Sequence, residues 1–120
     1  MAILTREAIL NASDLLTEVV EVPEWGGSVI VRGLSGAERD HFESSVVEMD
    51  GKKVKVKSEN MRAKLVALCV VDETGARIFS DQDVAALGQK SAAALDRVFQ
   101  AAQRLSGLTE VDVQELEKNS

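Results

Sequence analysis

The stretch that decides the fold lies at residues 17–43 and reads TEVVEVPEWGGSVIVRGLSGAERDHFE. Its first part, at 17–22, alternates valine with polar residues and predicts a β-strand. A second strand is predicted at 28–32, where SVIVR repeats the pattern. Residues 23–27 between them carry two adjacent glycines, which adopt the positive φ angles that hairpin loops need. We therefore predict an antiparallel hairpin.

A helix should follow this hairpin at about 36–48. Ser35 precedes it and Glu38 stands three residues later, which is the spacing of a capping box. Three apolar residues recur at helical spacing and predict one buried stripe: Phe42, Val46 and Met49. Asp50 and Gly51 then indicate a turn. The KKVKVK segment at 52–57 predicts a short strand or an extended loop lying on the domain.

Further helices are expected around the hairpin. Their predicted ranges and N-caps are 6–11 after Thr5, 59–70 after Ser58, 81–87 after Ser80, 89–105, and 111–118 after Thr109. The helix at 59–70 should be the most buried. The helix at 89–105 should turn one apolar stripe inward, made of Leu95, Val98, Phe99, Ala102 and Leu105. The apolar residues of the segment around 6–11 are too few for this helix to stand alone, so we expect it to lie against another element; they are Ile3, Leu4, Ile9 and Leu10.

These elements predict an α+β fold: a small antiparallel β-hairpin or sheet packed with four to six helices. A chain of 120 residues suits a single domain. We assign residues 1–108 to that domain and 109–120 to a short acidic, amphipathic C-terminal segment.

Composition narrows the classes of function. The chain has 14 basic and 20 acidic residues, a net charge of −6, which disfavours nucleic-acid binding. No apolar run approaches the ~20 residues that cross a bilayer, so we expect no membrane partner. The N-terminus lacks the pattern of a secretory signal, and the single cysteine excludes an internal disulfide. A cytoplasmic location is therefore expected.

The chain offers few groups for catalysis. His41 is the only histidine and Cys69 is the only cysteine, and one residue of each kind cannot make a structural zinc site. No catalytic partner is predicted for His41. The glycines match no phosphate-binding loop, and the acidic turns lack the spacing of a calcium-binding loop. We predict that the protein is not an enzyme and has no cofactor or metal.

Binding to other proteins is the class of function that remains. Trp25 at the hairpin tip is either an anchor for a partner or a side chain folded onto its own core. Residues 52–64 carry a local charge of +5, which suits either a docking patch for an acidic surface or a solvated face. The tail at 109–120 carries a side-chain charge of −3 and interleaved apolar residues, which suits either packing on a partner or a segment that caps its own domain or frays. The acidic tail of one copy meeting the basic segment of the next would give a head-to-tail homo-oligomer.

The segment VVEVPEWGGSVIVRGLSGAERDHFE at 19–43 resembles the N-terminal signature of tail assembly chaperones from long-tailed bacteriophages and prophages. Residues 62–108, followed by a short acidic end, are similar to these proteins in the order of their elements. The resemblance covers most of the chain, with residues 52–57 and the tail the least distinctive.

The resemblance implies a non-enzymatic assembly factor in the bacterial host cytoplasm. Such chaperones bind and solubilise the tape-measure protein, help recruit tail-tube subunits, and are absent from the mature virion. Many are made in two lengths by a ribosomal frameshift, and this chain resembles the shorter form. The alternatives are a structural tail or head–tail connector subunit and an unrelated small cytoplasmic adaptor. The candidate protein-binding residues are Trp25, Arg32, Arg39, Lys53, Lys55, Lys57 and Leu116. The alternative for Arg32 and Arg39 is an ion pair on their own surface with Glu24, Glu38 or Asp40.

Overall fold

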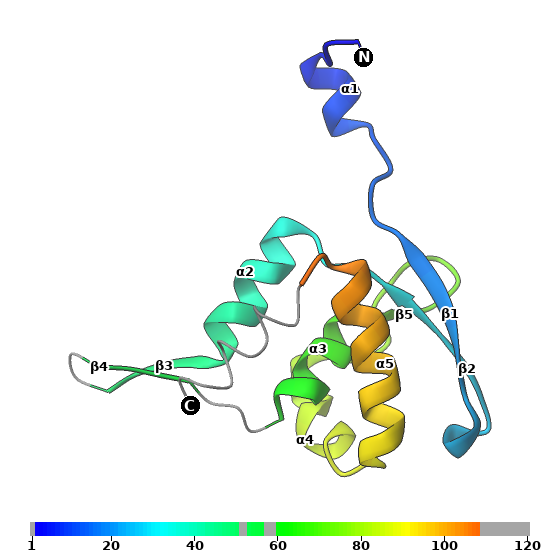
Figure 1. Ribbon diagram of the computed structural model, residues 1–120, viewed down its shortest axis with the longest axis vertical. Helices are drawn as coiled ribbons and strands as arrows, with labels where there is room; N and C mark the ends of the chain where they lie inside the picture. Colours follow the sequence, from blue (N-terminus) through cyan, green and yellow to red (C-terminus); the bar gives the residue numbers. More distant parts are fainter. Residues whose placement is uncertain (1, 51–52, 57–59, 109–120) are drawn as a thin grey trace.

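A computed structural model of the chain describes residues 2–50, 53–56 and 60–108, and for 47–50 and 53–56 it describes the backbone alone. A three-stranded antiparallel sheet, five α-helices and a separate two-stranded ribbon make up this part of the chain (Figure 1). The predicted α+β class is confirmed. The helices pack around one hydrophobic core, while the N-terminal helix and the ribbon project from it.

The predicted hairpin forms the sheet's first two strands. Strand β1 (Thr17–Val22) pairs antiparallel with β2 (Gly27–Arg32), in a register running from Thr17 opposite Arg32 to Val22 opposite Gly27. A short 3-10 turn, η1 (Pro23–Trp25), and Gly26 close the loop. Gly26 has a φ of 77°, the left-handed conformation that glycine adopts without strain. The prediction was therefore right about the pairing and the glycine turn.

The third strand was missed. Strand β5 (Val70–Val71) pairs antiparallel with β2 through Val71 opposite Ile30 and Val70 opposite Val31. Val70 had been predicted as the last residue of a helix. Two consecutive β-branched residues favour a strand once a sheet edge lies beside them. The spacing of apolar residues in this segment does not reveal that edge, because β2 is distant in the sequence.

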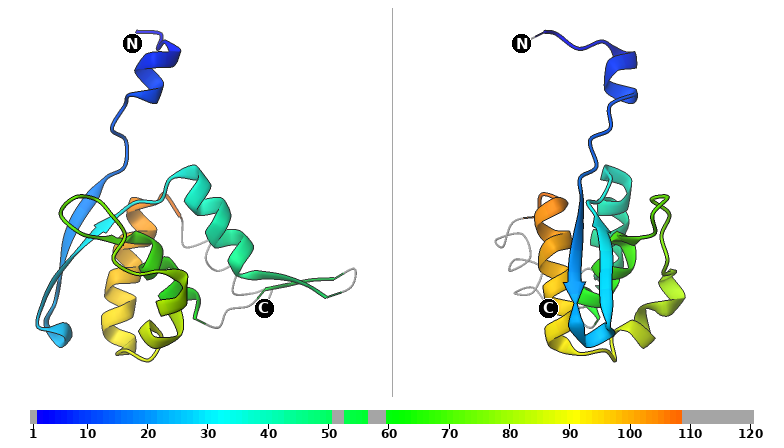
Figure 2. Two further views of the ribbon diagram at one scale, coloured as in Figure 1. Left: turned by 180° about the vertical axis from the view of Figure 1, so that it is seen from behind. Right: turned by 90° about the vertical axis from the view of Figure 1, so that its right-hand side faces the viewer.

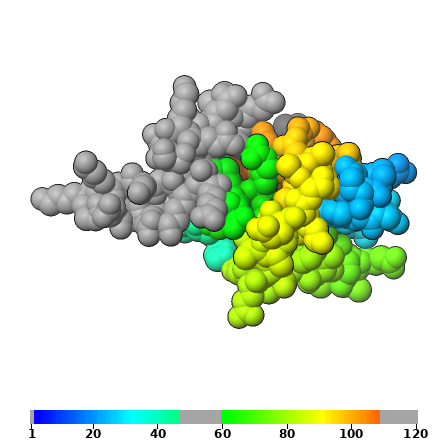
Figure 3. Space-filling view, turned by 90° about the horizontal axis from the view of Figure 1, so that it is seen from below, coloured from blue at the N-terminus to red at the C-terminus, as the bar shows by residue number. Residues whose placement is uncertain are grey.

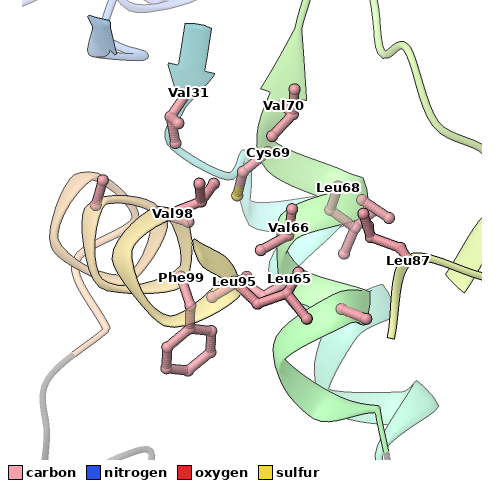
Figure 4. Packing of buried hydrophobic residues seen from close by; sticks show 14 of the residues in the cluster. Val31, Leu65, Val66, Leu68, Cys69, Val70, Leu87, Leu95, Val98 and Phe99 are labelled. Atoms are coloured by element: carbon pink, nitrogen blue, oxygen red, sulfur yellow. The ribbon is translucent and has the colours of Figure 1, made fainter. Parts of the chain in front are cut away.

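The core lies between helices α3 (Met61–Cys69) and α5 (Ala92–Leu105) and the inner face of the sheet (Figure 4). Seven of the nine residues of α3 are buried, which confirms it as the most buried of the helices described. Helix α5 buries one stripe, as its spacing predicted; its members are Ala94, Leu95, Val98, Phe99, Ala101 and Ala102. Leu105, also predicted to face inward, packs half-buried at the edge of the core.

Helices α3 and α5 begin two and three residues later than predicted, because the residue before each one starts the helix there. Helix α3 follows Asn60, which has a left-handed φ of 59°, and the predicted cap Ser58 lies outside the described residues. Helix α5 begins at Ala92 and not at Gln89, because the Ser91 hydroxyl accepts a hydrogen bond from the Ala94 amide.

The segment before α5 was predicted as one helix over 81–87. It forms a 3-10 turn, η2 (Asp81–Asp83), that leads into α4 (Val84–Leu87), and a capping box between Ser80 and Asp83 starts it. The helix predicted at 111–118 lies outside the described residues.

Helix α2 (Gly36–Ser45) opens with the predicted capping box: the Ser35 hydroxyl accepts from the Glu38 amide, and the Glu38 carboxylate accepts from the Ser35 amide. Its predicted end at residue 48 was wrong. The chain leaves the helix at Val46 and enters a strand at Val47, so Met49 does not extend the helical stripe. Consecutive valines again favour the extended chain.

That strand, β3 (Val47–Asp50), pairs antiparallel with β4 (Lys53–Val56). The strand alternative for 52–57 is therefore confirmed over Lys53–Val56, but the ribbon projects from the helices and does not lie on the domain (Figure 1). The predicted turn at Asp50–Gly51 includes Gly51, which lies outside the described residues.

The N-terminal helix was placed correctly, but its surroundings were not. Helix α1 (Arg6–Leu10) follows Thr5, whose hydroxyl accepts a hydrogen bond from the Ala8 amide. We expected it to lie against another element. Instead it projects from the globule on an extended linker, and none of its residues is buried (Figure 2). The physical reason is its length, since five residues offer the core too small an apolar face.

Candidate functional site

The underside of the molecule carries an apolar pocket. Trp25 comes to it from the hairpin tip, Phe79 from the loop before η2, and Leu87 from α4. The pocket has a volume of about 500 Å³, within the range of about 300–1,000 Å³ typical of binding pockets. Figure 3 shows the hairpin tip (blue) beside the segment that leads from α4 into α5 (yellow). The remaining lining residues are Glu24, Asp83, Ala86 and Lys90.

An ion pair fixes the hairpin tip at this pocket. The Arg97 guanidinium on α5 donates two parallel hydrogen bonds to the Glu24 carboxylate, Nη1 to Oε1 at 2.7 Å and Nη2 to Oε2 at 3.0 Å. These bonds lower the pKa of Glu24 from its ordinary value and raise the pKa of Arg97. The bidentate geometry holds the tip in one orientation relative to α5.

The position of Trp25 is compatible with both roles that its place in the sequence left open. It is half-buried and packs against the hydrophobic core, and it also lines the pocket. A tryptophan with one face on the core and one toward a cavity is a rigid apolar contact surface, because packing limits its rotamers. Its part in binding stays a prediction.

Arg32 and Arg39 lie within hydrogen-bonded networks of their own surface. Arg32 Nη2 donates to both oxygens of Glu38 at 2.9 and 2.7 Å, and its Nη1 donates to the Gly75 carbonyl at 3.2 Å. Arg39 Nε donates to Glu43 Oε1 at 3.0 Å, one helical turn along α2. Arg32 therefore joins β2, the start of α2 and the turn after β5, which is a structural arrangement.

The lysines of the ribbon stand opposite acidic residues. The register places Lys53 opposite Asp50 and Lys55 opposite Glu48. Residues of opposite charge therefore occupy facing positions along the ribbon. Lys57 and Leu116 lie outside the described residues. All four residues remain predicted contact positions.

The two side chains with potential for nucleophilic or acid–base chemistry, Cys69 and His41, lie in different surroundings. Cys69 is buried in the core, and this burial raises the pKa of its thiol to about 12. His41 is exposed on α2, with Nε2 3.1 Å from Asp81 Oδ2. A hydrogen bond from Arg77 and a weaker one from His41 lower the pKa of Asp81.

Among residues 2–50, 53–56 and 60–108, no group of three or more His, Cys, Asp or Glu residues is placed to hold a metal ion. No helix in the same part of the chain is long and apolar enough to cross a membrane. Two surfaces of the described residues remain as candidate binding sites: the pocket beside Trp25 and the apolar N-terminal helix.

The match to known families decides the class. The family model described as "Phage tail assembly chaperone" matches residues 5–119, nearly the whole chain. The chain belongs to this family. The resemblance seen in residues 19–43 and 62–108 is thereby confirmed. Searches of curated proteins and of solved structures gave no significant match.

Two features of this chaperone's surface were not predicted from the sequence. Phe79 and Leu87 give the pocket its apolar wall, yet they are distant in sequence from Trp25, so no local motif signals the pocket. The exposure of α1 did have a signal. Ile3, Leu4, Ile9 and Leu10 crowd around a helix too short to cover them.

Proposed function

We propose that this tail assembly chaperone binds and solubilises the tape-measure protein and helps to recruit tail-tube subunits while the tail assembles. It acts in the host cytoplasm as a non-enzymatic homo-oligomer and leaves before the virion is complete. The observation that carries the proposal is the family match over residues 5–119. The further contacts are assigned to Trp25 and to the predicted residues Lys53, Lys55, Lys57 and Leu116.

The exposed apolar residues support this role. Several large aliphatic side chains of the described chain lie open to solvent, among them Ile3, Leu4, Leu16 and Val19. Contiguous exposed apolar surface in a small protein marks a site of protein association. A chaperone that must let go of its client needs many modest contacts, and repetition along a long client supplies the total strength.

Co-expression with the client tests the proposal. The tape-measure protein of the same phage is produced alone and together with the chaperone. We expect it to be insoluble alone, and soluble and co-purified in the presence of the chaperone. A tape-measure protein that is equally insoluble in both cases, with no co-purification, would contradict the proposal.

Mass spectrometry of purified virions separates a chaperone from a structural subunit. A tail or head–tail connector protein stays in the particle and is detected there. The proposed chaperone is absent from particles yet present in lysates of infected cells. Its detection in virions at a stoichiometry similar to that of tail proteins would favour the connector alternative.

A charge swap tests the predicted head-to-tail contact between the tail and the basic segment. Reversing Lys53, Lys55 and Lys57 to glutamate should weaken self-association, because the acidic tail then meets like charge. A second variant reverses Glu110, Asp112 and Glu115 to lysine. Each variant alone should sediment as a smaller species, and their mixture should recover the larger one. Unchanged sedimentation of the first variant would refute this contact.

A further inference from the structure

The N-terminal arm, residues 2–16, presents an apolar surface that the described part of the chain leaves uncovered. Ile3 is 97% exposed, Leu4 and Leu10 are each 65% exposed, and Ile9 is 57% exposed. Scattered single apolar residues are ordinary on a protein surface, but here four exposed ones fall within eight positions of one short arm.

The arm is organised for contact. Leu4 precedes the cap residue Thr5 and Ile9 is the fourth residue of the helix, which are the two positions of a hydrophobic staple. A staple fixes the entry of the chain into the helix and groups these two side chains on one side. An isolated helix of five residues is not stable in water, so a surface that covers α1 would also stabilise it.

The pocket beside Trp25 is the matching surface. Trp25, Phe79, Ala86 and Leu87 supply its apolar lining, and its volume of about 500 Å³ suits one helical turn with its aliphatic side chains. Short amphipathic helices bind other proteins by placing apolar residues into grooves of this kind.

Each of the two surfaces carries charged residues of both signs. Arg6 and Glu7 lie on α1 between its apolar pairs, more than two-thirds exposed, and pair with each other at 3.6 Å, from Arg6 Nη1 to Glu7 Oε1. The pocket lining carries Asp83 and Lys90, also one acidic and one basic residue. Neither surface therefore repels the other by an excess of one charge, and a docked arm can set Arg6 against Asp83 and Glu7 against Lys90 at the edge of the apolar contact.

The two surfaces lie at opposite ends of one molecule. In Figure 1, α1 stands at the upper end, and the hairpin tip and α4 lie at the lower end. We propose that the N-terminal arm of one copy docks through Ile3, Leu4, Ile9 and Leu10 into the Trp25 pocket of a second copy. This contact is heterologous, so repeating it generates a ring or a spiral and not a closed dimer.

The inference rests on the proposed self-association and not on binding of the tape-measure protein. It also differs from the tail-to-lysine contact, because it uses neither the ribbon nor the C-terminal segment. All measurements below use the purified full chain alone. A negative result here would therefore leave the co-expression test of client binding unaffected.

Sedimentation of matched variants tests the docking. Ile9→Ser with Leu10→Ser removes two aliphatic contacts and should weaken self-association by about 100-fold, since burying each one contributes about tenfold or more. Its control is Ala8→Ser on the same exposed helix. Ala86→Phe fills the pocket from an exposed position on α4, and its control is Ala85→Phe, which lines a separate cleft. Both controls should associate like the wild type.

Mixing the two defective variants tests the direction of the contact. The arm variant keeps an intact pocket, and Ala86→Phe keeps an intact arm. Both variants also carry Lys53→Glu, Lys55→Glu and Lys57→Glu, which removes the predicted tail-to-lysine contact. The arm contact then allows these two to combine only once, so the mixture should form a 1:1 complex and nothing longer. Larger assemblies in the mixture would overturn the heterologous arrangement.

Trp25 reports on the pocket directly because it is the only tryptophan in the chain. Its fluorescence emission should shift to longer wavelength when the wild type is diluted and the arms leave the pockets. The arm variant should show the dissociated spectrum at every concentration. Three results would overturn the proposal: a wild type that stays monomeric, an arm variant that associates normally, or an arm-dependent spectrum that does not change on dilution, which would mean that each arm binds its own pocket.

Discussion

Substitution of Gly33 by alanine should lower the free energy of unfolding of the domain and leave its exposed surface unchanged. Gly33 is buried where β2 leads into α2, and its amide donates to the Leu16 carbonyl at 2.9 Å. A Cβ atom at this position would lie 2.4 Å from the carbonyl oxygen of Leu105 and 3.0 Å from its carbonyl carbon. Both are backbone atoms near the end of α5, and they cannot turn away as a side chain can.

The end of α5 is itself held in place, so the clash is not easily relieved. The Ser106 hydroxyl accepts from the Leu34 amide at 3.0 Å, and Leu108 is buried in the core. Overpacking of this kind lowers the free energy of unfolding by about 1–3 kcal/mol, and we expect about 2 kcal/mol because alanine also restricts the unfolded chain. For a domain of this size that corresponds to a decrease in Tm of roughly 8 °C.

Thermal and urea unfolding followed by circular dichroism measure this change. Gly36→Ala is the matched control, because nothing lies within 4 Å of its added Cβ and the residue begins α2. This control should be neutral or more stable by about 0.5 kcal/mol. If Gly33→Ala proved as stable as the control, the close approach of β2 to the end of α5 would be refuted.

Three further outcomes follow from single contacts. Ser106→Ala leaves the buried Leu34 amide without its acceptor and should lower the free energy of unfolding by about 1–3 kcal/mol, measured in urea, and an unchanged value would contradict that bond. The folded-state pKa of Glu24 is lowered from 4.5, so its pair with Arg97 stabilises the fold above the unfolded pKa and is lost as the pH falls through the folded one. The stability difference between wild type and Arg97→Met should therefore shrink as the pH is lowered from about 6 to about 3, and a constant difference would exclude this linkage. Cys69, with its pKa raised from 9.0 to about 12, should react with a thiol reagent at pH 8 about 10³-fold more slowly in the folded chain than in urea, whereas equal rates would show that the thiol is accessible.

Local patterns predicted the hairpin and the capped helices well. The glycine turn after Trp25, the capping box of Ser35 and Glu38, and the stripe of α5 each depend on neighbours within a few residues. Such short-range interactions can be predicted from neighbouring residues, because turn residues and caps satisfy backbone groups close to themselves.

The missed features depend on partners that are distant along the chain. Val70 and Val71 become a strand only because β2 lies beside them, and Val47 does so because β4 pairs with it. The site follows the same rule. Trp25 could be singled out at the hairpin tip, but the pocket needs Phe79 and Leu87 from elements more than fifty residues later. The ion-pair network of Arg32 was foreseen in part, since Glu38 was among its expected partners.

The network around Arg32 affects how infection phenotypes of mutant phages should be interpreted. One guanidinium holds Glu38 and the Gly75 carbonyl together, so replacing it loosens three segments at once. A fall in plaque number after substitution of Arg32 would therefore report a shortage of folded chaperone and say little about its partners. Genetic screens for contact residues gain more from positions such as Ala86 and Ile9, where the side chain is exposed and the fold does not depend on it.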